Sequence, residues 1–177
     1  MGTFERIAEE RATGWNAAAI ADLIARKSVR LEELERDVSV LFPGAADVVR
    51  RASAQVPIAI ASGALGHEIR RVLDREGLTS CFTAIVSAGE TARSKPAPDP
   101  YVRALALLER AAGAPMAPAE CIAVEDSVWG LESARAAGLR TVAIAHTYPA
   151  DALTSADLVL GSIRDLDVRA LADLCAT

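Results

Sequence analysis

Two adjacent carboxylates, Glu125 and Asp126, directly follow the apolar run Cys121–Val124. The run predicts a buried strand whose carboxyl end delivers both acids to one place, just before a helix that Ser127 opens. Two like charges side by side repel each other unless a cation lies between them. A hard divalent cation such as Mg²⁺, which binds one or two protein carboxylates together with phosphate oxygens and water, would relieve this repulsion. The alternative is a helix N-terminus whose dipole and Ser127 cap stabilise the acids without a metal.

Two other polar segments follow expected strands. Ser62-Gly63 comes directly after the apolar run 56–61, and a hydroxyl with free backbone N–H groups at a helix start can bind an anion. An ordinary helix cap is the alternative. Lys95 precedes Pro96, which favours an extended backbone at Lys95 and an ammonium held toward a fixed anion, such as a phosphoryl group. A solvated loop lysine is the alternative. Ligands bind at the carboxyl edge of open α/β sheets, so we expect these groups and the acid pair to converge there.

Helices alternate with apolar strands from about residue 56 onward. Strands that are apolar throughout are typical of a parallel sheet covered by helices on both faces, so we expect a Rossmann-like α/β fold. Strands are expected at 56–61, 83–86, 121–124, 141–145 and 157–160, and helices at about 68–76, 99–112, 127–137 and 166–174. In the second of these helices, Asp99 is expected as the N-cap and Pro100 in the first turn.

The first 41 residues show the apolar spacing of helices instead. One helix is expected from Phe4 to about Arg26. A second is expected to present Leu31, Leu34, Val38 and Leu41 on one side. Phe42-Pro43-Gly44 breaks the pattern. We therefore expect a helical segment at 1–41 and an α/β core at 42–177.

Composition narrows the class of protein. The chain has 177 residues, of which 51% are hydrophobic, and a formal charge of -5. The hydrophobic content is enough for a packed core, while the charge and the absence of a Lys/Arg block argue against a nucleic-acid partner. The cysteines lack metal-ligand spacing, which favours free thiols in a reducing compartment. The N-terminus is unlike a signal peptide and no apolar run is long enough for a membrane span, so we expect a soluble cytoplasmic protein.

A serine, a lysine and an acid pair on successive strand ends resemble the haloacid dehalogenase superfamily of phosphatases and phosphomutases. The resemblance extends from about Phe42 to the C-terminus. It rests on Pro43-Gly44, Ala61-Ser62-Gly63, Lys95-Pro96-Ala97-Pro98-Asp99 and Glu125-Asp126-Ser127, followed by Gly130, Ala134 and Gly138.

The resemblance also implies roles for these residues. Ser62 and the neighbouring amides, including Gly63, would hold the transferring phosphoryl group of a small phosphorylated metabolite. Lys95 would neutralise that group and the nucleophile, and Glu125 and Asp126 would hold Mg²⁺. Residues 1–41 would be the rear half of the helical cap that closes over the substrate.

One part of the family pattern has no counterpart. The resemblance implies an aspartate nucleophile and, two residues later, an acid/base aspartate, both after an apolar strand that precedes the cap. Only Met1-Gly2-Thr3 precedes the expected cap helices, and the sole Asp-x-Asp, Asp165-Leu166-Asp167, is expected to open the last helix. The missing strand would be the central one, between 58–61 and 122–124. We therefore expect a gap in the sheet and a chain truncated from a longer protein; closure of the gap, or a homo-oligomer that fills it, is the alternative.

The sequence thus predicts a Mg²⁺-dependent phosphatase that is inactive without its nucleophile, because a covalent aspartyl route needs the aspartate. A non-catalytic remnant that binds phosphate or a partner protein is the second hypothesis. A phosphomutase and a metal-free dehalogenase of the same fold are further ones, and the acid pair argues against the dehalogenase. A receiver-type domain would need its acid pair near the start of the chain. His146 follows the fourth expected strand near the same edge, with no partner visible for a catalytic dyad.

Overall fold

The computed structural model describes residues 14–36 and 38–175, which fall into two compact units, Met1–Val40 and Leu41–Thr177. Among the described residues of the first unit, helix α2 runs over Ala17–Glu35, and the Asn16 side chain caps it by accepting the Ala19 N–H at 2.9 Å. The expectation of a break between Arg26 and Leu31 is therefore wrong. That stretch contains neither glycine nor proline, and an Asp22–Arg26 ion pair supports the continuous helix. The expected helix at residues 4–13 lies outside the described residues.

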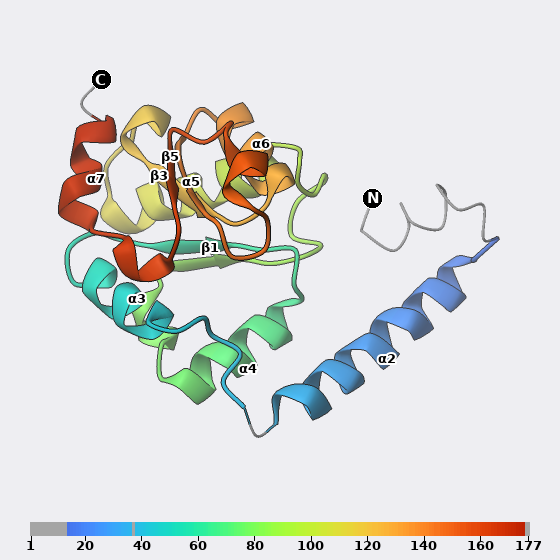
Figure 1. The fold of residues 1–177 in the computed structure, drawn as a ribbon. Helices are drawn as coiled ribbons and strands as arrows, with labels where there is room; N and C mark the ends of the chain where they lie inside the picture. Colours follow the sequence, from blue (N-terminus) through green and yellow to red (C-terminus); the bar gives the residue numbers. More distant parts are fainter. Residues whose placement is uncertain (1–13, 37, 176–177) are drawn as a thin grey trace. The chain divides into compact units, whose positions relative to one another are not determined.

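The second unit alternates strands with helices, as the sequence predicts (Figure 1). Its strands are β1 Ala59–Ala61, β2 Ala84–Val86, β3 Ile122–Glu125, β4 Arg140–Ile144 and β5 Leu158–Leu160. Its α-helices are α3 Ala45–Ser53, α4 Gly66–Glu76, α5 Asp99–Ala112, α6 Val128–Ala136 and α7 Val168–Cys175. Short 3-10 turns are η1 Thr79–Cys81, η2 Pro118–Glu120, η3 Ala150–Leu153 and η4 Ile163–Asp165. No α-helix in the described ranges has both the length and the apolar character needed to cross a bilayer.

The strands form two parallel sheets instead of one. β1 pairs with β2, and β3, β4 and β5 pair in that order. Among the described residues no ladder joins β1 to β3, so the predicted gap in the sheet is confirmed. The gap also explains why Val124, which was expected to be buried, is 42% exposed. Its strand has a partner on one edge only.

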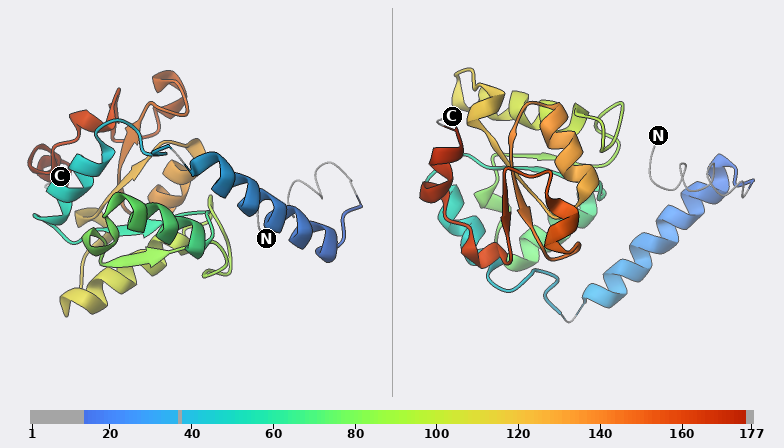
Figure 2. Two further views of the ribbon diagram at one scale, coloured as in Figure 1. Left: turned by 90° about the horizontal axis from the view of Figure 1, so that it is seen from below. Right: turned by 45° about the horizontal axis from the view of Figure 1, so that its top comes forward.

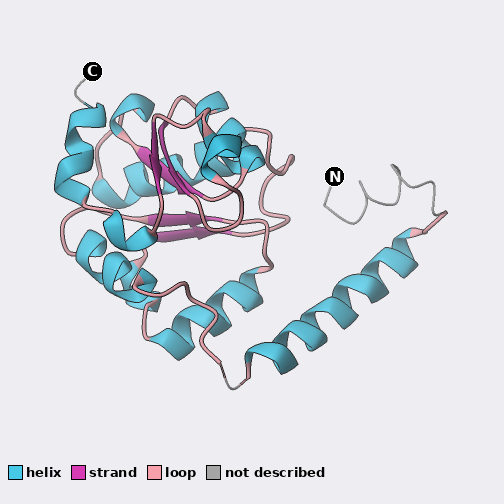
Figure 3. Cartoon of the chain, viewed as in Figure 1, coloured by secondary structure: helices cyan, strands magenta, loops and turns pink. Residues whose placement is uncertain are grey.

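Helices cover both faces of these sheets, and the strands lie in the interior (Figure 3). On one face α3 and α4 pack over Ile60 and Ile85 of the smaller sheet. On that same face α3 and α7, which lie on one side in the right-hand view of Figure 2, pack over Val142 and Ile144 of the larger sheet. On the other face α5 contacts β1 and β2, and α6 contacts β3 and β4. This layered arrangement confirms the predicted α/β class.

Two helix starts differ from the prediction. The N-cap of α5 is Pro98, while Asp99 is the first helical residue and pairs with Arg93 at 2.9 Å. A charged partner nearby outcompetes the helix amides for the Asp99 carboxylate, and the hydrogen bond from Arg93 lowers the pKa of Asp99. Helix α3 was not predicted at all. It begins after Gly44, which has a left-handed φ of 85°, and its nine residues are too few to show a clear period.

The local structure of Asp165-Leu166-Asp167 agrees with the expectation that this segment opens the last helix. Asp165 ends η4, and Asp167 lies just before α7. The Asp167 carboxylate accepts the N–H of Arg169 at 3.0 Å, which is what a residue capping a helix start does.

Candidate active site

Two residues distant in sequence meet at the centre of the candidate site. Lys95 lies in the loop between β2 and α5, and Glu125 is the last residue of β3. The Lys95 ammonium contacts Oε1 of Glu125, and the two side chains are 20% and 8% exposed. The loop therefore turns Lys95 toward a fixed anion, as its position before Pro96 suggested. In this structure that anion is Glu125.

Four donors surround the Glu125 carboxylate. Oε1 accepts the Tyr101 hydroxyl as well as Lys95, and Oε2 receives the Asp126 N–H and the Ser127 hydroxyl, each at 3.3 Å. Burial, and then the negative charge of Glu125, raise the pKa of Tyr101, so its phenol stays protonated and donates. Protein groups thus occupy both oxygens of Glu125.

The start of α6 closes over this carboxylate. Ser127 caps the helix by accepting the Gly130 N–H at 3.1 Å. A Cβ at Gly130 would overlap the Glu125 carboxylate, so only glycine leaves room for it. The sequence analysis named Gly130 only as part of the family resemblance, and the structure shows that Glu125 packs beneath it.

Asp126 lies in a different environment from its neighbour. It follows β3 on the turn into α6, is partly exposed, and accepts the hydroxyl of Thr147 from the loop after β4. Neighbouring side chains at a strand end point to opposite sides. The acid pair is therefore divided into an internal carboxylate, Glu125, and a partly exposed one, Asp126.

The donor chemistry at this edge suits a hard cation. Mg²⁺ is bound by one or two carboxylates and completes its shell with water and phosphate oxygens. Asp126 fits that role, since Thr147 engages Oδ2 only. Glu125 would have to exchange one of its four donors for the metal. No cluster of three or more metal-binding side chains exists within the part of the chain that the structure describes.

Ser62 lies at the carboxyl end of β1, as expected. Its N–H donates to Val86 O at 2.9 Å, and its Oγ accepts the Ala64 N–H at 3.1 Å. The hydroxyl proton of Ser62 is therefore directed away from Ala64. Of the three amides at 62–64, only that of Gly63 has no hydrogen-bond partner among the described residues. The predicted anion site is thus reduced to one hydroxyl and one amide.

Three contributing residues were missed in the sequence analysis: Tyr101, Thr147 and Ser133. Ser133 of α6 is fully buried, and its hydroxyl donates to Ala97 O at 2.6 Å, which holds the Lys95 loop against α6. The Lys95–Pro96 peptide bond in this loop is cis. Tyr101 is the third residue of the helix that follows the lysine loop, and Thr147 lies three residues after the end of β4. The sequence shows that both residues lie near the end of a strand or the start of a helix. It does not show which side chains they contact.

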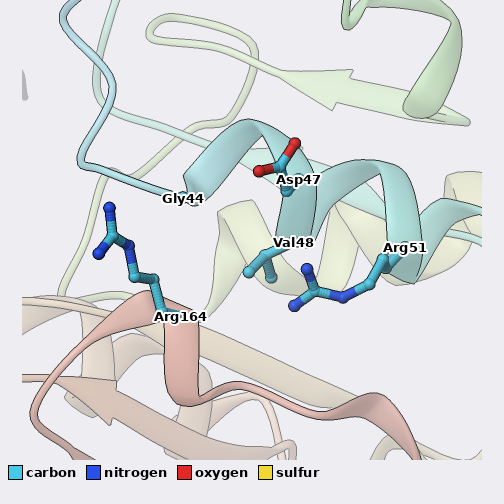
Figure 4. Close-up of a pocket in the computed structure, with 5 residues that line it drawn as sticks. All are labelled: Gly44, Asp47, Val48, Arg51 and Arg164. Atoms are coloured by element: carbon cyan, nitrogen blue, oxygen red, sulfur yellow. The ribbon is translucent and has the colours of Figure 1, made fainter.

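A separate pocket lies between α3 and η4 (Figure 4). Gly44, Asp47, Val48, Arg51 and Arg164 line it. Arg164 extends toward Gly44, and its Nε donates to Pro43 O at 3.1 Å. This contact ties the segment that begins the α/β unit to the turn after β5. The predicted site residues do not line the pocket.

The fold and site together define a class: a Rossmann-like α/β protein with a lysine–carboxylate centre beside a partly exposed aspartate. A family model for haloacid dehalogenase-like hydrolases matches residues 2–138. The chain belongs to this family, and the resemblance inferred from its motifs is confirmed.

Relatives of the chain include CbbY proteins and a hexitol phosphatase. Protein CbbY of Rhodobacter capsulatus is 35% identical over 182 residues, which cover 98% of this chain and 78% of that protein. Hexitol phosphatase B of Escherichia coli K12 is 30% identical, with 89% of this chain and 69% of that protein covered. The crystal structure of CbbY from Rhodobacter sphaeroides in complex with phosphate has a TM-score of 0.81 and 29% identity, covering 97% of this chain and 78% of that one. A mutant of that CbbY was crystallised with xylulose-(1,5)bisphosphate.

Proposed function

We propose that the chain carries the lysine, metal-binding and phosphate-binding parts of a Mg²⁺-dependent phosphatase for a small phosphorylated sugar. The observation that carries this proposal is the Lys95–Glu125 contact immediately beside Asp126. It brings a cation and a partly exposed carboxylate to one edge of the sheets. Phosphoryl transfer depends on positioning and on stabilising charge at the phosphoryl oxygens, which is what such a pair of groups supplies.

Each residue then has a defined task. The Lys95 ammonium neutralises phosphoryl oxygens, while Glu125 and Tyr101 keep it in place. The Ser62 hydroxyl and the Gly63 amide donate to the phosphoryl group. Asp126 holds Mg²⁺, with Glu125 as the second carboxylate if it exchanges a donor. The bound metal supplies further neutralisation of the phosphate charge.

We infer that the aspartate nucleophile stands on a strand that pairs with both β1 and β3. The absence of a ladder between these strands in the described residues supports this, and so does the exposure of Val124. Such a strand would come from a segment beyond these 177 residues. A second copy of the chain is the competing source of a strand for the gap, but it would not supply the nucleophile, because the sole Asp-x-Asp is Asp165-Leu166-Asp167. The codons that precede Met1 should then encode an apolar run followed by Asp-x-Asp. A stop codon directly upstream, with no other start, would contradict the first source.

The relatives favour a phosphatase acting on a sugar. The match to hexitol phosphatase B covers 89% of the chain, whereas that to beta-phosphoglucomutase of Bacillus subtilis covers 57% at 32% identity. A mutant of the Rhodobacter sphaeroides CbbY was crystallised in complex with a sugar bisphosphate, xylulose-(1,5)bisphosphate. We also propose a cytoplasmic location, which the three free thiols support.

Phosphate release by the natural gene product tests this function. The substrates are hexitol phosphates, pentulose bisphosphates and glucose 1-phosphate, each with Mg²⁺ and with EDTA. Lys95→Met and Asp126→Asn should each lower kcat/KM about 10²–10³-fold, the typical loss of one stabilising group in a preorganised site. Glu132→Gln, at an exposed position of α6, is the matched control and should retain activity.

The alternatives predict other results. A non-catalytic remnant releases no phosphate from any ester, although it still binds inorganic phosphate. A metal-free dehalogenase releases halide from a haloacid in the presence of EDTA. Phosphate release that persists in Asp126→Asn would contradict the metal role assigned to Asp126.

A further inference from the structure

Two neighbouring side chains in the loop after β4 reach different parts of the α/β unit. The Thr147 hydroxyl donates to Oδ2 of Asp126. The ring of His146 lies against the ring of Phe42, with centroids 4.0 Å apart and planes inclined by 34°. Phe42 is the second residue of this unit, where the chain arrives from the helical segment. The loop therefore contacts the candidate metal carboxylate with one residue and the start of the unit with the next.

We propose that Thr147 is a positioning residue for the Asp126 carboxylate, and that the Phe42–His146 ring contact keeps Thr147 within reach of it. The proposal rests on the function proposed above, in which Asp126 binds Mg²⁺. It adds that the conformation of the chain at Phe42 affects the metal affinity of Asp126.

The geometry at Asp126 explains why Thr147 matters. A carboxylate on a turn can rotate, and rotation reduces its affinity for a cation. A hydrogen bond to Oδ2 orients the group and leaves Oδ1 to bind the metal. Outer residues that orient metal ligands in this way typically change metal affinity about 10–100-fold. Glu125 is already held by its four donors, so Asp126 is the carboxylate whose orientation depends on a single side chain.

The loop itself is fixed at its start but not at Thr147. The Ala145 N–H donates to Leu160 O of β5 at 2.9 Å, and the His146 N–H donates to Ile144 O at 2.8 Å. These bonds hold the backbone just before Thr147, which is itself exposed. The next restraint along the loop is the ring of His146 against Phe42. Loss of that ring contact should therefore loosen Thr147 and leave β4 intact.

Phe42 is suited to this role although it is 49% exposed. Its own carbonyl accepts the Ala45 N–H at 3.0 Å, and the carbonyl of Pro43 accepts Nε of Arg164 at 3.1 Å. The backbone on its C-terminal side is thus anchored to α3 and η4. Neither anchor touches Asp126, so the link from Phe42 to that carboxylate passes through His146 and Thr147.

Manganese binding to the ¹⁵N-labelled 177-residue chain tests the proposal without measuring activity. Mn²⁺ broadens the amide signals of residues near the metal, and the concentration dependence of the broadening at 126–128 yields an apparent Kd. Thr147→Val should raise this Kd about 10-fold, and Thr147→Ser should restore it. Thr154→Val, at another exposed threonine, is the matched control and should match the unchanged chain. The amide spectrum reports whether each variant is folded.

A double-mutant cycle tests the link to Phe42. Phe42→Ala should raise the Kd in the unchanged chain and have no further effect in the Thr147→Val background, because both changes act through one contact. Amide hydrogen exchange at 145–147 should also become faster in Phe42→Ala. Independent effects of the two substitutions, or an unchanged Kd in Phe42→Ala, would overturn this part of the proposal.

The possible failures are distinguishable. If Asp126→Asn broadens like the unchanged chain, the metal role in the proposed function fails, and the positioning role fails with it. If Asp126→Asn abolishes the broadening but Thr147→Val does not weaken it, Asp126 keeps its metal role and the role of Thr147 is overturned.

Discussion

The ammonium of Lys95 lies against Oε1 of Glu125, although 30 residues separate them in the sequence. The contact joins the loop that follows β2 to the end of β3, strands that belong to different sheets. It is also poorly exposed to solvent, so it affects stability as well as chemistry. Removing one partner of a buried ion pair leaves an uncompensated charge, which costs more than the pair itself contributes.

Lys95→Met should therefore lower the free energy of unfolding by about 3 kcal/mol, because Glu125 would be left charged and largely buried. Adding Glu125→Gln should recover part of this loss, since the amide needs no cation. Urea denaturation at pH 7 measures both. Lys27→Met, at the only other lysine of the sequence, is the control and should change stability by less than about 0.5 kcal/mol. Strictly additive losses would show that the two side chains do not interact.

Gly130→Ala should destabilise the fold by about 3 kcal/mol, because its Cβ would overlap the Glu125 carboxylate. In an ordinary helix the same change stabilises by about 1 kcal/mol, so the sign of the effect is the test. Thermal or urea unfolding measures it. Gly161→Ala, where a Cβ meets nothing within 4 Å, is the control. A neutral or stabilising Gly130→Ala would mean that Glu125 does not lie beneath α6.

Tyr101 should not ionise while the chain is folded, because burial and the Glu125 charge raise its pKa above the ordinary value of about 10. A group whose pKa is raised on folding contributes stability at pH values below its unfolded pKa. That contribution declines as the pH rises above about 10.

Phenolate absorbance in Tyr148→Phe, where Tyr101 is the remaining tyrosine, checks this prediction. It should appear only as circular dichroism reports unfolding. A reversible phenolate signal near pH 10 in the folded variant would show that Tyr101 is exposed. Separately, Tyr101→Phe should cost about 1–2 kcal/mol through the lost donor to Glu125.

Asp157 links the starts of β4 and β5. Its carboxylate accepts the N–H and the hydroxyl of Thr141 at 2.7 and 2.8 Å. Burial acts to raise the pKa of Asp157, but these hydrogen bonds and nearby arginines outweigh it and the pKa is lowered. A lowered pKa means that the contribution to stability is present above the unfolded value of about 3.9 and is lost as the pH falls through the folded value.

Asp157→Asn should therefore destabilise the chain by about 1 kcal/mol at pH 7. The difference from the unchanged chain should decrease below about pH 4, where the aspartate gains a proton. Urea midpoints between pH 3 and pH 7 measure this. Asp151→Asn, at an exposed aspartate in η3, is the control. A stability difference that does not change over this range would assign the effect to shape instead of charge.

Local patterns were sufficient for much of the fold. The apolar runs located the five strands, and Gly77, Gly113 and Gly138 follow the helices that end near them, each with the left-handed φ that favours glycine. The patterns failed where the signal was short or uniform. Helix α3 has nine residues, and α2 continues through a stretch where two helices were expected. In both places the local sequence pattern gave no clear signal of where a helix begins or ends.

The sequence by itself determined the α/β class, the parallel orientation of the strands, the placement of Ser62 and the acid pair at strand ends, and that of Lys95 in the loop after the second strand. Periodicity and strand-end positions are local properties, so they can be inferred from one sequence. Only the tertiary structure decided that Glu125 is internal and Asp126 partly exposed, and that Tyr101 and Thr147 are their partners. Those outcomes depend on which side chains from distant segments come within hydrogen-bond distance, and no local pattern contains that information.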